Sequence, residues 1–138
     1  MDLRPYRPAD LPGCLAVLDS HLPDAGQRAE FETFLTAPRG SYFVLEHDRS
    51  LVGCGGYVAQ APTARLVWGV IRRDAQHQGL GRFLLMYRLR EIGKVANIET
   101  VSVEVPPDAA GFFEAQGFRK AGERGARVTL VKRLIVCS

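Results

Sequence analysis

The spacing of apolar residues predicts a strand followed by two helices in the first third of the chain. Residues 3–6 form a short strand. A helix is expected from about residue 11 to Ser20, with Asp10 as its N-cap, because apolar residues then recur at intervals of three and four. A second helix covers residues 27–35. The apolar positions of the two helices are Leu11, Cys14, Leu15, Leu18, Phe31, Phe34 and Leu35.

The middle of the chain predicts a hairpin, a buried strand and a long helix. Residues 42–46 and 51–59 form the two strands of the hairpin, and a polar segment joins them. Residues 65–71 form the next strand, whose almost continuous apolar run is typical of a central position covered on both faces. The long helix is expected over residues 79–95. Its buried face is predicted to carry Leu80, Phe83, Leu84 and Tyr87.

The last part of the chain completes the pattern. It predicts a strand over residues 99–105, a short helix over 108–116, and two strands over 118–121 and 128–134. The order β-α-α-β-β-β-α-β-α-β-β indicates an α/β (α+β) fold with a mixed central sheet and helices on both faces. Because no repeats, low-complexity segments or linkers interrupt it, we expect a single domain over residues 1–138.

Composition and charge limit the kinds of protein that this chain can be. The chain has 138 residues, of which 46% are hydrophobic and 24% charged, and these shares are ordinary for a globular protein. Its net charge of +3 is small and scattered, which suits an anionic cofactor better than a nucleic-acid track. No apolar run is long enough to span a membrane, and the N-terminus lacks the apolar core of a signal peptide. A cytoplasmic protein is therefore expected.

The spacing of cysteine and histidine argues against a disulfide framework and a metal site. Cys14, Cys54 and Cys137 are odd in number and widely separated, which favours a reducing compartment. His77 has no second ligand at helical or hairpin spacing, so no metal is expected. Cys54 stands among glycines, where a small core thiol is a better interpretation than a nucleophile.

The turn Gln76-His77-Gln78-Gly79-Leu80-Gly81 lies between the apolar strand and the long helix. The first turn of a helix presents main-chain N–H groups without intrahelical partners, and the helix dipole adds about half a positive charge there. Gly79 and Gly81 have no β-carbon, so a phosphate can approach the main chain closely. A phosphate-bearing cofactor is predicted at residues 76–82. The basic residues that flank the turn are Arg72, Arg73 and Arg82.

This turn resembles the acetyl-CoA-binding motif of the GNAT N-acetyltransferases, Gln/Arg-x-x-Gly-x-Gly/Ala. The segment 112–118 is similar to the aromatic-aromatic-x-x-x-Gly-Phe ending of the family's last helix, and the order of elements also fits. A Rossmann fingerprint fails because Leu84 takes the place of the third glycine, and a P-loop fails because no Gly-Lys-Ser/Thr follows. The resemblance implies a GNAT-type mixed sheet and an acyl-CoA-dependent N-acetyltransferase.

The resemblance also implies where acetyl-CoA lies. In this fold the strand before the turn and the strand after the long helix splay apart, and pantetheine pairs with the main chain of the first strand. These segments would be residues 69–73 and 102–105, and a main-chain N–H near Gly69–Val70 would polarise the thioester carbonyl. The residues expected at the cofactor are Gly69, Val70, Ile71, Arg73, Gln76, His77, Gln78, Gly79, Leu80, Gly81, Arg82 and Phe113.

The chain departs from the family at the positions that transfer protons. Many members use a tyrosine of the last helix to protonate the departing sulfur, and the matching residue here is Phe113. Glu104, on the strand after the long helix, is the remaining acid in reach and is predicted to be the general base that takes the amine proton. The alternative is a carboxylate at a frayed strand end, solvated or paired with Arg65 or Arg127. Many members also carry Glu or His on the strand before the turn, where this chain has Arg65, Leu66, Val67 and Trp68.

The leading prediction is transfer of an acetyl group from acetyl-CoA to an amine, a small molecule or a protein amino group, by direct attack in a ternary complex. The acceptor cannot be identified from the sequence, and its pocket is expected between the loop 21–27 and the turn 123–126. The alternative is a CoA-binding or regulatory module with little or no turnover. Acetyl-CoA or CoA is the expected partner, nucleic acid and membrane are not, and a homodimer is left open.

Overall fold

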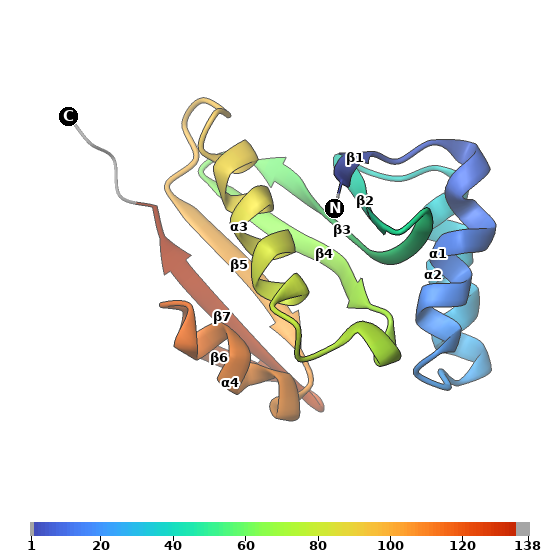
Figure 1. The fold of residues 1–138 in the computed structure, drawn as a ribbon. Helices are drawn as coiled ribbons and strands as arrows, with labels where there is room; N and C mark the ends of the chain where they lie inside the picture. The colour runs from blue at the N-terminus through green and yellow to red at the C-terminus, as the bar shows by residue number, and fades with distance from the viewer. Residues whose placement is uncertain (1, 135–138) are drawn as a thin grey trace.

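A seven-stranded sheet runs through the molecule, and helices cover both of its faces (Figure 1). The computed structural model describes residues 2–134. The strand order is β1-β2-β3-β4-β5-β7-β6, with β4 and β5 parallel and all other neighbours antiparallel. The elements are β1 (Asp2–Pro5), η1 (Pro8–Asp10), α1 (Leu11–Asp19), α2 (Ala25–Thr36), β2 (Ser41–His47), β3 (Ser50–Gln60), β4 (Thr63–Ile71), η2 (Arg73–Ala75), α3 (Leu80–Ile92), β5 (Thr100–Val105), α4 (Pro107–Ala115), β6 (Arg119–Arg124) and β7 (Arg127–Arg133).

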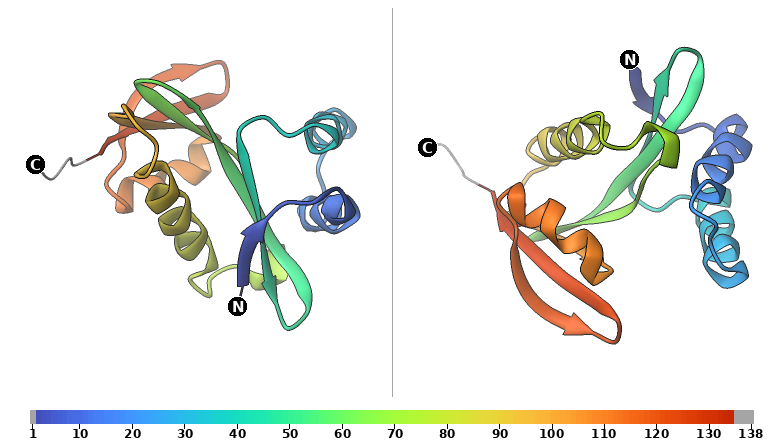
Figure 2. Two further views of the ribbon diagram at one scale, coloured as in Figure 1. Left: turned by 90° about the horizontal axis from the view of Figure 1, so that it is seen from above. Right: turned by 60° about the horizontal axis from the view of Figure 1, so that its bottom comes forward.

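This order confirms the predicted fold class and adds two short 3₁₀ turns to it. Helices α1 and α2 lie on one face of the sheet, and α3 and α4 lie on the other (Figure 2). β4 is the fourth strand of seven, so its central position is also confirmed. Among residues 2–134 no helix is long and apolar enough to cross a membrane.

The two N-terminal helices begin differently from what the sequence predicts. The Asp10 side chain does not cap α1: its carboxylate accepts from both terminal nitrogens of Arg4 at 2.8 Å and from the Arg7 main-chain N–H at 2.8 Å. This ion pair joins β1 to the start of α1. Helix α2 begins two residues before the predicted start, because Asp24 caps it by accepting from the Gln27 N–H at 2.7 Å.

The buried face of α3 is also different from the prediction. Phe83 is 38% exposed, so its placement in the core was wrong. The helix ends at Ile92 rather than at residue 95. Residues spaced by four line the buried face. The pattern is not apparent in the sequence because one of them, Arg88, is charged. The buried residues of α3 are Leu80, Leu84, Leu85, Arg88 and Ile92.

Apolar clusters hold the sheet from both sides. On one face, side chains of α3 and α4 such as Leu85 and Phe113 pack against Val101 and Val103 of β5. On the other, α1 and α2 pack against β2 and β3 through a cluster that includes Cys14 and Cys54, both free thiols. Cys137 lies outside the described residues. The cores fix β4 between two layers of helices.

Candidate active site

Strands β4 and β5 separate along their length, which exposes one edge of β4. They pair over Thr63–Arg65 and Thr100–Ser102. Beyond that point β4 continues to Ile71 beside β3, and β5 continues to Val105 beside β7 (Figure 1). The main chain of residues 66–71 therefore has no β5 partner in the sheet on this side.

A bulge in β4 lies on this separated segment. Val67 pairs with Gly56 and Val70 with Cys54, so Trp68 and Gly69 stand opposite a single β3 residue. Trp68 has φ 44°, a left-handed conformation that a bulky side chain rarely adopts. A bulge re-aims the local main chain and is often found beside active sites.

Two contacts hold the bulge in place from the α1–α2 side. The Tyr42 hydroxyl donates to the Trp68 carbonyl oxygen at 2.7 Å. The Trp68 ring stacks on Phe31 of α2, with ring centroids 4.8 Å apart and planes 27° apart. Gly69, the next residue, remains exposed. The Gly69 main chain is thus exposed on the separated segment, and its contact with a thioester stays a prediction.

The turn before α3 offers a row of free main-chain donors. Within residues 2–134, none of the N–H groups of residues 77–82 donates a hydrogen bond. His77 has φ 63° and Gly79 has φ 80°, so two left-handed residues bend the main chain sharply just before the helix begins. The helix dipole of α3 adds positive potential at the same place. These features suit an anion with several oxygen atoms, and phosphate binding at this turn stays a prediction.

The three arginines around the turn differ in how free their charges are. Arg72 pairs with Asp74, with Nε 2.6 Å from Oδ1. Arg82 Nε donates to the Gln116 side chain at 3.3 Å. Neither Arg73 nor Arg82 forms an ion pair within the described part of the chain, and the Arg73 guanidinium makes no side-chain hydrogen bond there, so its charge is the least engaged of the three.

The loop after α1 is fastened to the end of β4 and to the turn. His21 Nε2 lies 2.6 Å from the Ile71 carbonyl oxygen, and because a carbonyl oxygen only accepts, Nε2 is the donor of this hydrogen bond. The Arg73 N–H donates to Ser20 Oγ at 2.9 Å. The sequence predicts this loop as one wall of the acceptor pocket but gives no sign of these contacts, which link residues 50 and 53 positions apart.

Glu104 lies on β5 beyond its pairing with β4. Its neighbours Val101 and Val103 are buried against α3, so Glu104 and Ser102 face the opposite side of the strand. No ion pair involves Glu104 within residues 2–134, and Arg127 contacts its main-chain oxygen at 3.3 Å rather than its carboxylate. The carboxylate is thus not neutralised by the arginines that could have paired with it, and its role as base stays a prediction.

The two adjacent phenylalanines of α4 differ in exposure and in the residues that they contact. Phe113 is 9% exposed and packs edge-on against Phe118, with centroids 5.4 Å apart. Phe112 is 40% exposed, and its ring lies 3.7 Å from the position that a β-carbon on Gly81 would occupy. The aromatic ring beside the turn is therefore that of Phe112, which is not among the residues predicted to contact the cofactor. Contact between Phe113 and a cofactor stays a prediction.

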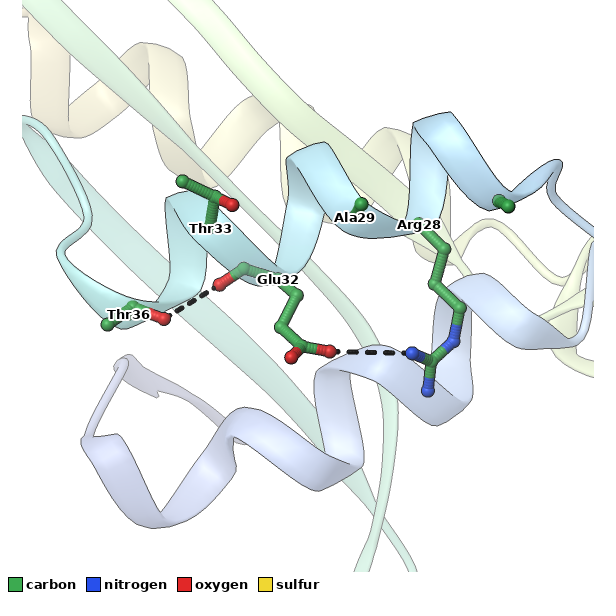
Figure 3. Close-up of a pocket in the computed structure, with 6 residues that line it drawn as sticks. Arg28, Ala29, Glu32, Thr33 and Thr36 are labelled. Carbon is green, nitrogen blue, oxygen red and sulfur yellow. Dashed lines mark hydrogen bonds and ion pairs between the residues drawn. The ribbon is translucent and has the colours of Figure 1, made fainter.

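A separate shallow hollow lies on the outer face of α2 (Figure 3). Arg28 and Glu32 cross it as an ion pair with a 3.4 Å separation. Because one helix supplies all of its lining and the paired charges satisfy each other, it lacks the converging groups of a reaction centre. The lining residues are Ala25, Arg28, Ala29, Glu32, Thr33 and Thr36.

Comparison with known proteins identifies the family. The sequence profile of the acetyltransferase (GNAT) domain matches residues 38–120, which is more than half of the chain. The chain belongs to the GNAT family. The matched region contains the β4 bulge, the turn and α3, so the predicted resemblance is confirmed. No curated protein sequence matches this GNAT chain.

Solved structures agree with this assignment. An acetyltransferase from Thermus thermophilus is 28% identical, with a TM-score of 0.75 over 96% of each chain. The ribosomal-protein-S18-alanine N-acetyltransferase from Escherichia coli is 19% identical, with a TM-score of 0.81 over 99% of this chain and 96% of that one. The PaiA N-acetyltransferase from Thermoplasma acidophilum, solved with coenzyme A, is 15% identical, with a TM-score of 0.78 over 96% and 98%. The last two show that the GNAT fold is shared.

Proposed function

We propose that this protein transfers an acetyl group from acetyl-CoA to the amino group of a small molecule or a protein. The row of free N–H groups at residues 77–82 carries the proposal, because it matches the several oxygens of a pyrophosphate. The unpaired edge of β4 supports it, since an amide-bearing arm such as pantetheine can pair with an exposed strand edge. Thermoplasma PaiA, with the same fold, is solved with coenzyme A.

The chemistry expected here is direct attack in a ternary complex. The amine nitrogen attacks the thioester carbon, an N–C bond forms, the C–S bond breaks, and CoA leaves as a thiolate that water protonates. A main-chain N–H near Gly69–Val70 would stabilise the oxygen during attack, and Glu104 would take the amine proton directly or through water. Holding both reactants in place would supply much of the acceleration.

A second candidate is a GNAT domain that binds CoA with little or no turnover. The observation that favours it is Phe113, which stands at the position of the family's acidic tyrosine, has no hydroxyl and packs into the core. An enzyme that takes both protons to and from solvent has no need of that tyrosine, so the same observation is compatible with turnover.

An amine panel separates the two candidates. The full chain is incubated with acetyl-CoA and with polyamines, amino acids, aromatic amines and peptides with free N-termini, and the released thiol is measured. Acetyl-CoA-dependent thiol release above the no-amine control supports the enzyme. Micromolar CoA binding without release on any amine supports the binding module. The expected cytoplasmic location and single-domain organisation remain proposals that are compatible with either.

A further inference from the structure

Arg88 carries a charge inside the protein, on the buried face of α3. The residue is 4% exposed. Nη1 donates to the Gly56 carbonyl oxygen at 3.3 Å, whereas Nε is buried and has no hydrogen-bond partner. No carboxylate within residues 2–134 forms an ion pair with the guanidinium. A buried cation without a counter-charge is costly, so its presence on an otherwise apolar face calls for a reason.

Two glycines make room for this guanidinium directly behind the bulge of β4. A β-carbon on Gly69 would lie 2.9 Å from Nη2, and one on Gly55 would lie 3.3 Å from Cζ. The guanidinium thus occupies the space that side chains at these two positions would fill. Gly69 itself is exposed on the segment where β4 has left β5. Only Gly69 therefore separates the charge from the surface on which the thioester is expected.

The surroundings disfavour the charge without removing it. Burial lowers the pKa of Arg88 to about 10, so the side chain is still a cation at neutral pH. The ionisable side chains that act on it, Tyr42 and Cys54, are not carboxylates. Groups that are held in unfavourable environments beside a reaction site are typical of function rather than of stability.

We propose that Arg88 is a positioning residue of the transfer reaction, whose buried charge behind the Gly69 peptide stabilises the negative charge on the thioester oxygen. The inference rests on the proposed function, because it requires acetyl-CoA at the β4 bulge. When the amine attacks, the carbonyl electrons move onto this oxygen, and they return as the C–S bond breaks. Arg88 gives and takes no proton. A fixed charge in a water-excluded place acts strongly on such a transition state and needs no reorganisation.

Three variants test the charge. Arg88→Met removes the charge and keeps an unbranched side chain, and Arg88→Lys keeps the charge. Arg90→Met is the matched control, because Arg90 lies on the same helix with its side chain 68% exposed. We expect Arg88→Met to lower kcat by roughly 10- to 100-fold, with the Kd for CoA within about twofold and a melting temperature equal to or above the parent's. Arg88→Lys should retain more activity than the Met variant, and Arg90→Met should match the parent.

A spectroscopic measurement separates this inference from the proposed function, since it needs no acceptor. Carbonyl-¹³C acetyl-CoA is bound to each protein, and its C=O stretch is recorded by difference infrared spectroscopy. The parent and Arg90→Met should shift the band to lower wavenumber than free acetyl-CoA, and Arg88→Met should shift it less. Equal bands in the parent and Arg88→Met would overturn the inference.

Two other outcomes are also decisive. A parent that binds CoA but gives neither a band shift nor turnover would contradict the proposed function itself. A parent that prefers succinyl-CoA or malonyl-CoA, with the preference lost in Arg88→Met, would show that the guanidinium binds an acyl carboxylate, and the inference as stated would be wrong.

Discussion

Replacing Tyr42 by Phe removes the hydroxyl that holds the β4 bulge and leaves the ring in place. The lost hydrogen bond is 2.7 Å long and part-buried, and the Trp68 carbonyl loses its partner. Such a loss costs about 1–2 kcal/mol of unfolding free energy. In a domain of this size the melting temperature should fall by about 3–8 °C. Because Trp68 holds a left-handed conformation at φ 44°, the bulge should also relax. We expect kcat to fall by roughly tenfold or more, since small misplacements of a reacting group are costly.

Tyr6→Phe is a matched control for this experiment. The Tyr6 hydroxyl donates to the Leu35 carbonyl oxygen at 2.9 Å, which is the same chemistry away from the bulge. Both variants are measured by thermal unfolding and by thiol release under saturating acetyl-CoA. The two should lose similar stability, and Tyr42→Phe alone should lose kcat. If both keep the parent's kcat, or lose it in proportion to stability, the view that Tyr42 sets the geometry of the bulge is refuted.

Two further predictions concern carboxylates. Glu104→Gln should lower kcat by roughly 10²–10⁴-fold and remove the acidic limb of the pH–rate profile, with CoA affinity unchanged; an unchanged limb would mean that the amine arrives neutral or loses its proton to water. The Arg4 guanidinium lowers the pKa of Asp10, so this pair stabilises the fold above the ordinary carboxyl pKa, and the effect is lost as the pH falls through the folded-state pKa. Asp10→Asn should therefore lose about 1–3 kcal/mol of unfolding free energy at pH 7 and little in strong acid. Asp48→Asn, at a side chain 90% exposed, should lose almost none. Urea unfolding of the parent and the two variants is measured at pH 7 and in strong acid, below the lowered pKa of Asp10.

The order of the elements could be predicted from the sequence because apolar periodicity and turn residues are local signals. The same holds for the turn at residues 76–81, whose glycines mark it directly. What could not be predicted depends on pairings between distant residues. Asp10, which was predicted to cap a helix, instead pairs with Arg4, and the Tyr42 hydroxyl donates to the carbonyl of Trp68, 26 positions away. Neither contact has a local signature.

The buried face of α3 shows a different limit of sequence reasoning. A search for apolar residues selects Phe83 and passes over Arg88, although a spacing of four residues connects Leu80, Leu84 and Arg88. The glycines that accommodate the guanidinium lie on β3 and β4, so the space for it exists only in the folded sheet. The choice between Phe112 and Phe113 is of the same kind, since adjacent helical residues differ in direction and only the packing of α4 decides which one meets Gly81.

Calorimetric titration of CoA into Gly81→Asp tests whether the turn before α3 binds the phosphates of CoA. Gly81 is a better position for the variant than Gly79, because Gly79 has φ 80° and any side chain there is strained. A β-carbon on Gly81 makes only ordinary contact with Phe112 at 3.7 Å, so the fold should survive while a carboxylate meets the phosphates. Gly122→Asp adds the same charge on β6, where nothing lies within 4 Å. We expect the parent and Gly122→Asp to bind CoA equally and folded Gly81→Asp to bind at least tenfold more weakly. Equal binding by all three proteins would refute phosphate binding at this turn.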